Sequence, residues 1–387
     1  MLIGRLIFAT VLTLSAVTFF PAVAPAQLAT VGFEVLVQDD FVGGAQISTN
    51  GQVAGLSSAS ASGSGGARDL STGLGIFSVS GNGGAIAPYV SGDGQVIQGY
   101  VFGPDVPPFE SLYEYRRSGP NAGLTTFPEP RVYSPTGLNG DGSVSIGVHE
   151  TLGGVRYVGG LDQTPETLGT LAGGTSNVVP LGISENGLSI AGSGSSPLGI
   201  QAMRWDRGVL TPLGDIAGGD FASAGLAISP DGSAVVGYGT DDVGQMATRW
   251  RAGGMQALGR LDLDDTVSRA VDTSDLGWRV VGYSADSTGR YAPSNPRAFV
   301  YDDAAGMQDL NILLASLGID LTGIILEQAT GISGDGQTIV GSGTLNDDFG
   351  SYQIAWKATL PIPEPGTAVL LGLGLAGLAR TSRKQAR

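Results

Sequence analysis

The chain contains no cysteine and a single histidine, His149, among its 387 residues. Without cysteine it has no disulfide framework, no thiolate metal site and no cysteine nucleophile. With one histidine it has no two-histidine zinc site, and a Ser-His-Asp triad could only use His149. Charged residues make up only 14% of the chain, too few for a coiled coil or a disordered acidic tail.

Basic residues are also scarce between the two ends of the chain. Residues 27–362 hold 34 acidic and 15 basic side chains, a net charge of about −19, and Lys357 is the only lysine among them. A surface of this sign repels nucleic acid and anionic lipid, because binding to phosphate needs clustered Lys and Arg. The composition therefore predicts no nucleic-acid partner and suits a wet, cation-containing matrix.

Glycine, in contrast, is abundant: 64 residues, or roughly 17% against about 7% in average proteins. Many of these glycines belong to a repeated motif, in which an apolar residue, a small polar residue and two turn residues precede a glycine. Ile228-Ser229-Pro230-Asp231-Gly232 and Ile332-Ser333-Gly334-Asp335-Gly336 are examples. The seven turn glycines are Gly51, Gly94, Gly142, Gly187, Gly232, Gly277 and Gly336. Their spacing is close to 45 residues, with one insertion before the last copy.

Each copy is typical of a β-hairpin, because Asp-Gly or Asn-Gly between β-rich runs provides the positive φ of a tight turn. A second glycine after the turn, such as Gly237 or Gly341, indicates a place where backbones crowd. An aromatic marker accompanies each copy. It is found at Tyr115, Tyr157, Trp205, Trp250, Tyr301 and Trp356, with Arg68-Asp69 as a degenerate first marker. One unit has room for four strands, which near Trp205 are expected at 201–206, 209–213, 223–229 and 233–238.

Four strands in about 45 residues predict an all-β propeller of four-stranded blades, seven in number, over residues 27–360. The last aromatic strand, 352–358, has no turn motif after it, and the first motif has no clear aromatic strand before it. We therefore expect the C-terminal strand to close the ring by completing the blade that holds Gly51. The alternative is an open β-solenoid, although such folds usually repeat at 20 to 30 residues.

The repeat resembles the HAF-type extracellular repeat family over Ala202–Tyr238, and less closely over Ala247–Tyr283, where Asp262-Leu263-Asp264-Asp265 replaces a Gly-Gly element. The resemblance implies an exported, propeller-like domain. It implies no activity and no catalytic residues.

Residues 1–26 are typical of a secretory signal peptide, with Arg5 before the apolar run Leu6–Phe20. Ala24 and Ala26 are the small residues expected before cleavage at Gln27. An N-terminal membrane anchor is the alternative, but the apolar run is short for a bilayer. The absence of cysteine also fits export to an oxidising compartment.

The other end, residues 361–387, has the pattern of a stop-transfer signal. The triplet Pro363-Glu364-Pro365 leads into an apolar stretch at 367–379, and basic residues close the chain at Arg380, Arg383, Lys384 and Arg387. About 13 apolar residues are marginal for spanning a bilayer, which favours transient membrane contact. These residues closely resemble the PEP-CTERM sorting signal. The resemblance implies recognition by an exosortase, removal of the tail, export to the cell surface, and association with exopolysaccharide and biofilm.

Candidate chemistry between the ends is sparse. His149 is expected at a strand end. The aspartates of the Asp-Gly turns are explained by turn chemistry, with calcium ligation as the alternative. Four acidic clusters are predicted to lie in loops at the ends of the domain: Asp241-Asp242, Asp262–Asp265, Asp302-Asp303 and Asp347-Asp348.

No enzyme motif is present: the sialidase Asp-box fails, because Asp and Gly are adjacent here and no Trp follows. We expect a non-enzymatic binding or structural protein without a cofactor, whose partner could be an extracellular polysaccharide. The alternative is a carbohydrate-active propeller, a glycoside hydrolase or lyase, because hydrolysis needs only two carboxylates.

Overall fold

The structure is a computed structural model that describes residues 31–39, 42–58, 64–73, 75–80, 85–102, 110–119, 122–127, 133–287 and 293–361. The predicted signal peptide lies outside these residues, and so does the predicted sorting signal apart from Pro361. The described residues form 28 β-strands, a 3-10 helix η1 (Asp275–Gly277) and one α-helix, α1 (Leu310–Ser316).

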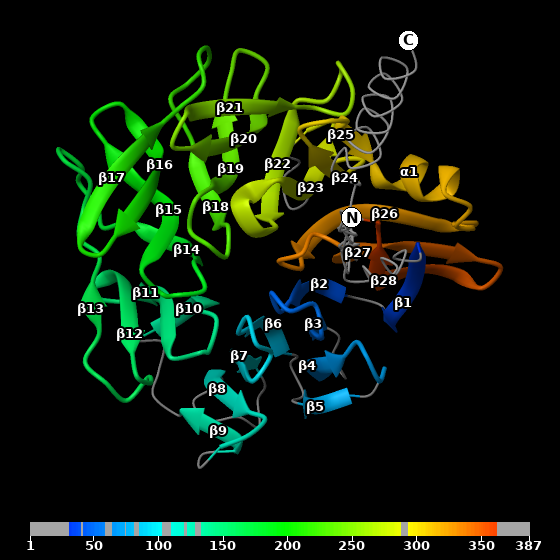
Figure 1. Ribbon diagram of the computed structural model, residues 1–387, viewed down its shortest axis with the longest axis horizontal. Coiled ribbons are helices and arrows are strands. Elements are labelled where there is room, and N and C mark those ends of the chain that lie inside the picture. The colour runs from blue at the N-terminus through cyan, green and yellow to red at the C-terminus, as the bar shows by residue number, and fades with distance from the viewer. Residues whose placement is uncertain are drawn as a thin grey trace, which may run out of the picture.

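The strands make seven four-stranded antiparallel blades around a common axis, which Figure 1 views end on. Blade 1 consists of β2 (Val42–Ile47), β3 (Val53–Ser58), β4 (Ser64–Asp69) and β5 (Gly75–Ser80). Blade 2 consists of β6 (Ala85–Val90), β7 (Val96–Phe102), β8 (Glu110–Arg116) and β9 (Gly123–Phe127). Blade 3 consists of β10 (Tyr133–Leu138), β11 (Val144–His149), β12 (Gly153–Val158) and β13 (Glu166–Thr167).

The chain continues around the ring in the same way. Blade 4 consists of β14 (Val179–Ile183), β15 (Ser189–Ser196), β16 (Gly199–Asp206) and β17 (Val209–Gly214). Blade 5 consists of β18 (Ala224–Ile228), β19 (Val235–Thr240), β20 (Gln245–Arg251) and β21 (Gly254–Gly259). Blade 6 consists of β22 (Val267–Thr273), β23 (Arg279–Ala285), β24 (Arg297–Asp302) and β25 (Gly306–Asp309). Blade 7 consists of β26 (Ile324–Ile332), β27 (Thr338–Asp347), β28 (Gly350–Thr359) and β1 (Gly32–Asp39).

The predicted hairpins are the turns between the first and second strands of each blade. The first polar residue of the motif accepts a hydrogen bond from the backbone N–H five residues later, as Ser229 Oγ does from Ala234 at 2.9 Å. The aspartate two residues on caps the turn, as Asp335 Oδ1 does for the N–H of Gln337 at 2.9 Å. The turn aspartates therefore stabilise their own turns through hydrogen bonds to the backbone, as turn chemistry predicts.

These seven turns lie at one end of the propeller, which we call the turn face. The opposite end carries the hairpins between second and third strands, together with the links from one blade to the next, and we call it the loop face. Both ends of the described chain leave at the turn face. Gly32 pairs with Thr359, and the N–H of Leu360 donates to the carbonyl of Gln337 beside the blade 7 turn.

The predicted closure of the ring through the C-terminal strand is confirmed, since β28 pairs with β1 from Gly32–Thr359 to Asp39–Gln353. The two strands lie side by side in Figure 1. The predicted blade was wrong, however. β28 is the third strand of blade 7, and β1 joins it as the outer strand, whereas Gly51 belongs to blade 1. The seven turn motifs already supply the inner hairpin of every blade, so the missing strand was an outer one.

The sequence unit and the blade also differ in phase. The four strands expected around Trp205 are present as β16, β17, β18 and β19, close to their predicted bounds. β16 pairs with β15 and β17, however, and β18 pairs with β19, so the unit spans the outer half of blade 4 and the inner half of blade 5. Pairing partners, which the repeat alone does not specify, decide where one blade ends.

The aromatic markers lie on third strands and pack between blades. Trp205 is 6% exposed and packs against Ile146 of blade 3, while Arg156 stacks on its ring at 4.9 Å. Trp250 and Tyr301 hold matching positions opposite the third residue after their turn glycines. Trp356 does not. Trp356 pairs with Gly341, and it is Ala358, two residues later, that lies opposite Ile339, the third residue after the turn glycine Gly336. Trp356 is nevertheless fully buried, and its indole N–H donates to Ser342 at 2.8 Å.

The second glycine of the repeat lies where backbones crowd, as predicted. A Cβ on Gly237 would lie 1.9 Å from the carbonyl oxygen of Ala224 on the neighbouring strand. The insertion before the last copy is α1 with the segment that follows it. Leu310 and Leu314 of this helix are buried in the core cluster around Trp356.

Ending the chain at Phe349 should unfold the whole ring cooperatively, because it removes β28, leaves β1 without its partner strand and exposes one edge of β27, which stays paired with β26. Urea unfolding followed by intrinsic fluorescence and by circular dichroism measures this. The expected result is a lower midpoint with both probes. An unchanged midpoint would contradict the closure.

Gly237→Ala should lower the free energy of unfolding by about 2 kcal/mol or more, because its Cβ has no room beside Ala224. Gly253→Ala is the matched control. A Cβ there meets nothing within 4 Å, and the residue has no positive φ. Equal effects of the two substitutions in urea titrations would show that crowding is not the cause.

Candidate functional site: the central channel and the two faces

A channel of about 310 Å³ runs along the axis and is lined by the first strands of all seven blades. Five blades contribute a residue that the strand pairing skips, so that a β-bulge turns it toward the axis. These residues are Thr136, Leu181, Leu226, Val271 and Thr330. The channel wall is therefore mostly aliphatic side chain and strand backbone.

Asp272 is, with Glu185, one of the acidic residues that line this channel. It stands two residues before the motif serine, where blades 3, 4, 5 and 7 have Gly137, Gly182, Ala227 and Gly331. Its carboxylate accepts hydrogen bonds from the N–H of Ile332 at 2.9 Å and of Thr273 at 2.8 Å, so it bridges blades 6 and 7. Burial raises the pKa of Asp272 from 3.8 to about 6, against the lowering effect of these two donors.

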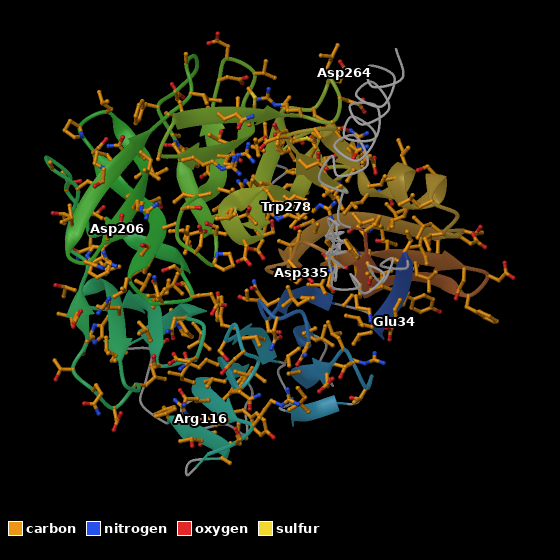
Figure 2. The ribbon with its side chains drawn as sticks, viewed as in Figure 1. Glu34, Arg116, Asp206, Asp264, Trp278 and Asp335 are labelled. Atoms are coloured by element: carbon orange, nitrogen blue, oxygen red, sulfur yellow. The ribbon has the colours of Figure 1, made fainter. Side chains whose placement is uncertain are left out.

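The turns form a ring of backbone hydrogen bonds at one end of the channel. Figure 2 shows Trp278 and Asp335, from the hairpins of blades 6 and 7, near the middle of this ring. Six of the seven junctions between neighbouring blades have a hydrogen bond from a backbone N–H of one turn to a backbone carbonyl of the next. With the residue of the N–H given first, the pairs are Asn50–Gly92, Asp93–Gly140, Gly140–Glu185, Glu185–Pro230, Asp275–Gly334 and Gly334–Thr49. The remaining junction lacks one because Pro230 has no N–H.

Acidic residues of this ring include Glu185 and Asp275. The carboxylate of Glu185 reaches from the blade 4 turn to those of blades 2 and 3, where a Cβ on Gly92 or Gly140 would lie within 2 Å of it. Asp275 is exposed, and its pKa is raised by desolvation first and then by Asp231 and Asp335. Among the described residues, no three His, Asp or Glu side chains lie close enough to hold a metal ion.

A second hollow, of about 460 Å³, lies between the outer strands of blade 2 and the segment after β12. Glu114 and Arg116 line it and form an ion pair at 2.7 Å. The pair leaves few free polar groups facing this hollow, so the channel is the better candidate site.

The acidic clusters are in loops, as predicted, but on both faces. Asp241-Asp242, Asp262–Asp265 and Asp347-Asp348 are on the loop face, whereas Asp302-Asp303 is in the β24–β25 turn on the opposite face. Several of these carboxylates pair with arginine: Arg260 with Asp241 at 2.7 Å, and Arg297 with Asp262 at 2.7 Å. His149 ends β11, as predicted, and its Nδ1 accepts from the N–H of Thr151 at 3.2 Å.

The loop face also displays apolar side chains at equivalent positions. The hairpins between second and third strands of blades 3, 4, 5 and 7 each place an exposed apolar residue directly before a glycine of positive φ. These residues are Leu152, Leu198, Val243 and Phe349, and the most exposed is Phe349 at 90%. Leu263, in the link between blades 5 and 6, is fully exposed on the same face. Sequence reasoning missed this pattern, although a comparison of the repeats at the apolar-Gly pairs would have found it.

The strand order defines a β-propeller. Residues 361–384 match the model of the PEP-CTERM protein-sorting motif. The chain therefore carries a PEP-CTERM motif, which implies sorting to the cell surface and processing by an exosortase. The residues predicted for it, Pro363, Glu364, Pro365, Arg380, Arg383, Lys384 and Arg387, lie outside the described part of the chain, as do Ala24, Ala26 and Gln27. Within that part, no helix has the length and apolar composition to cross a membrane.

No curated protein matches the sequence. Among solved structures, a TolB-type protein from Agrobacterium tumefaciens is 18% identical, with a TM-score of 0.46 over 75% of this chain and 94% of that one. TolB from Acinetobacter baumannii is 15% identical, with a TM-score of 0.43 over 78% and 79%. Kuenenia stuttgartiensis hydrazine synthase is 14% identical, with a TM-score of 0.45 over 78% and 92%. Likeness at this level carries no functional argument, and the propeller assignment rests on the strand order.

Asp272→Asn should flatten the pH dependence of stability. The native state binds the Asp272 proton up to about pH 6 and the unfolded state only up to about pH 4. The free energy of unfolding should therefore fall as the pH rises through this interval, by roughly 3 kcal/mol. Urea titrations from pH 4 to pH 7 measure the slope. Asp348→Asn, at a surface loop, is the control. Parallel curves for Asp272→Asn and the unaltered chain would contradict the assignment.

Proposed function

We propose that the protein is a non-enzymatic binding or structural module of the cell surface, and that the loop face is its contact surface. One observation carries the proposal: both chain ends leave at the turn face, and the opposite face presents equivalent apolar tips. A tail inserted in the bilayer would place the turn face toward the membrane and the loop face away from it. The loop face is then the surface that meets extracellular material.

The chemistry of this face suits a neutral extracellular polysaccharide. Two of the tips directly follow carboxylates in the sequence: Val243 follows Asp241-Asp242, and Phe349 follows Asp347-Asp348. Sugars offer hydroxyl groups, which donate strongly to carboxylates, and C–H faces, which pack on apolar side chains. An acidic polysaccharide is disfavoured, because the net charge of about −19 over residues 27–362 repels it.

The enzyme alternative has one feature in its favour. Asp272, with a pKa near 6, and Glu185 line the same channel. Glycoside hydrolysis uses two carboxylates, one of which needs a raised pKa. Both carboxylate oxygens of Asp272 already accept hydrogen bonds from backbone N–H groups of blades 6 and 7, which favours a structural role for this residue, so the binding role is the stronger proposal.

The test is a glycan array with the tail-free protein, paired with a screen for polysaccharide turnover. The triple variant Leu198→Ser, Val243→Ser and Phe349→Ser should weaken binding to neutral glycans at least tenfold. Leu276→Ser, at an exposed apolar residue of the turn face, should not weaken it. Binding confined to acidic glycans, or equal binding by both variants, would contradict the proposal. Turnover that Asp272→Asn abolishes would establish the enzyme instead.

A further inference from the structure

Arg279 departs from the repeat in a way that the fold does not require. It stands five residues after the motif serine of blade 6, where the other copies have Val, Ser, Ala or Thr: Val53, Val96, Val144, Ser189, Ala234 and Thr338. In most blades this small side chain packs under the turn glycine of the next blade, as Val53 does under Gly94. Here the side chain of Trp278 covers Gly336 instead, and that of Arg279 extends past Gly336 to Pro361, the last described residue.

The guanidinium holds the last described residue of the chain. Nη2 of Arg279 donates to the carbonyl oxygen of Pro361 at 3.1 Å, and Nη1 donates to that of Gly336 at 2.6 Å. The guanidinium also stacks on the Trp278 ring at 4.6 Å, and the residue is only 4% exposed. Leu360, 2% exposed, adds a backbone hydrogen bond to Gln337. We call the Arg279–Gly336–Pro361 contact the clasp.

The clasp lies at the start of the sorting motif. Pro361 is the first residue that matches the motif, and Ile362 is the single residue between it and Pro363-Glu364-Pro365. Two peptide units span at most about 7 Å, so covalent geometry alone keeps the triplet next to the clasp. A processing enzyme takes up an extended stretch of substrate, and backbone that is hydrogen-bonded to a folded domain must first be released.

We propose that the clasp restrains removal of the C-terminal tail, and that Arg279 sets how often the chain before the triplet is released to the processing enzyme. Removal breaks one peptide bond, whose acyl half passes to water or to an amine and whose amine half leaves with a proton. Arg279 acts before this step and takes no part in it. The inference rests on the sorting motif and is independent of what the loop face binds.

The surroundings explain why this residue is an arginine. A buried guanidinium can donate to two carbonyl groups at once, whereas lysine presents a single centre of charge. Asp302 and Asp335 favour the charged guanidinium through their Coulombic interaction, which opposes the desolvation that lowers the Arg279 pKa. The neighbouring Arg251 also donates to turn-face carbonyl groups, those of Leu276 and Gly277, but among the described residues it has no hydrogen bond to Leu360 or Pro361.

The test follows the full chain in its native cells by pulse-chase labelling and mass spectrometry, with the tail-bearing and tail-free forms measured over time. Arg279→Met keeps the apolar stem against Trp278 and removes every donor. We expect the tail to be lost roughly tenfold faster, a factor that corresponds to about 1.4 kcal/mol of lost restraint. The Arg279→Lys variant should lose its tail at a rate between that of Arg279→Met and that of the unaltered chain.

Two controls separate release of the clasp from loss of folding. Arg251→Met removes a guanidinium from the same face and should leave the rate unchanged. A ten-residue Gly-Ser spacer between Ile362 and Pro363 should give the fast rate with Arg279 intact, and Arg279→Met should then add nothing.

The proposal is overturned by an unchanged rate in Arg279→Met, by equal acceleration in Arg251→Met, or by an additive effect of the spacer and Arg279→Met. It is also overturned if no tail-free form of the unaltered chain is found.

Discussion

Each blade is held to the next by the turn between its first two strands, and the geometry of that turn constrains the rest of the molecule. Gly94 shows the constraint. Its φ is +70°, and a Cβ would lie 2.6 Å from Val53 of the preceding blade. Seven such contacts, with six backbone hydrogen bonds between neighbouring turns, fix the distance from one inner strand to the next. Because every blade is held in the same way against the one before it, the row of seven blades curves into a ring and its two ends meet.

Closure and the channel both follow from this spacing. The inner strands are held apart by the turn ring, so their free edges face a channel and are not packed together. β28 and β1 pair where the ends meet, so blade 7 has four strands like the other blades. The same arrangement puts both ends of the domain on one face. Under the proposed function, a tail held in the membrane then leaves the turn face near the bilayer and the loop face away from it.

The positions of functional interest are those that break the repeat. Asp272 stands where four other blades have glycine or alanine, and it links blade 6 to the neighbouring blade 7 by accepting a hydrogen bond from the N–H of Ile332. Arg279 stands where other blades have a small or β-branched residue, and it holds Pro361. Both departures are visible once the seven copies are aligned with one another. What each residue contacts is not visible, because its partner belongs to another blade or to the end of the chain.

The sequence by itself determined the class of fold, the number of blades, the turn chemistry and the identity of the C-terminal sorting motif. These features are local, since a positive-φ glycine, a side-chain cap or a Pro-Glu-Pro triplet depends only on neighbouring residues. The tertiary structure decided the rest. In the folded protein β28 is the third strand of blade 7, Trp356 lies two residues before the marker position, and the equivalent apolar tips lie on one face. Strand pairing decides the first two, because β28 joins β1 from the other end of the described chain and its register against β27 sets the place of Trp356. The tips share one face because successive strands alternate in direction.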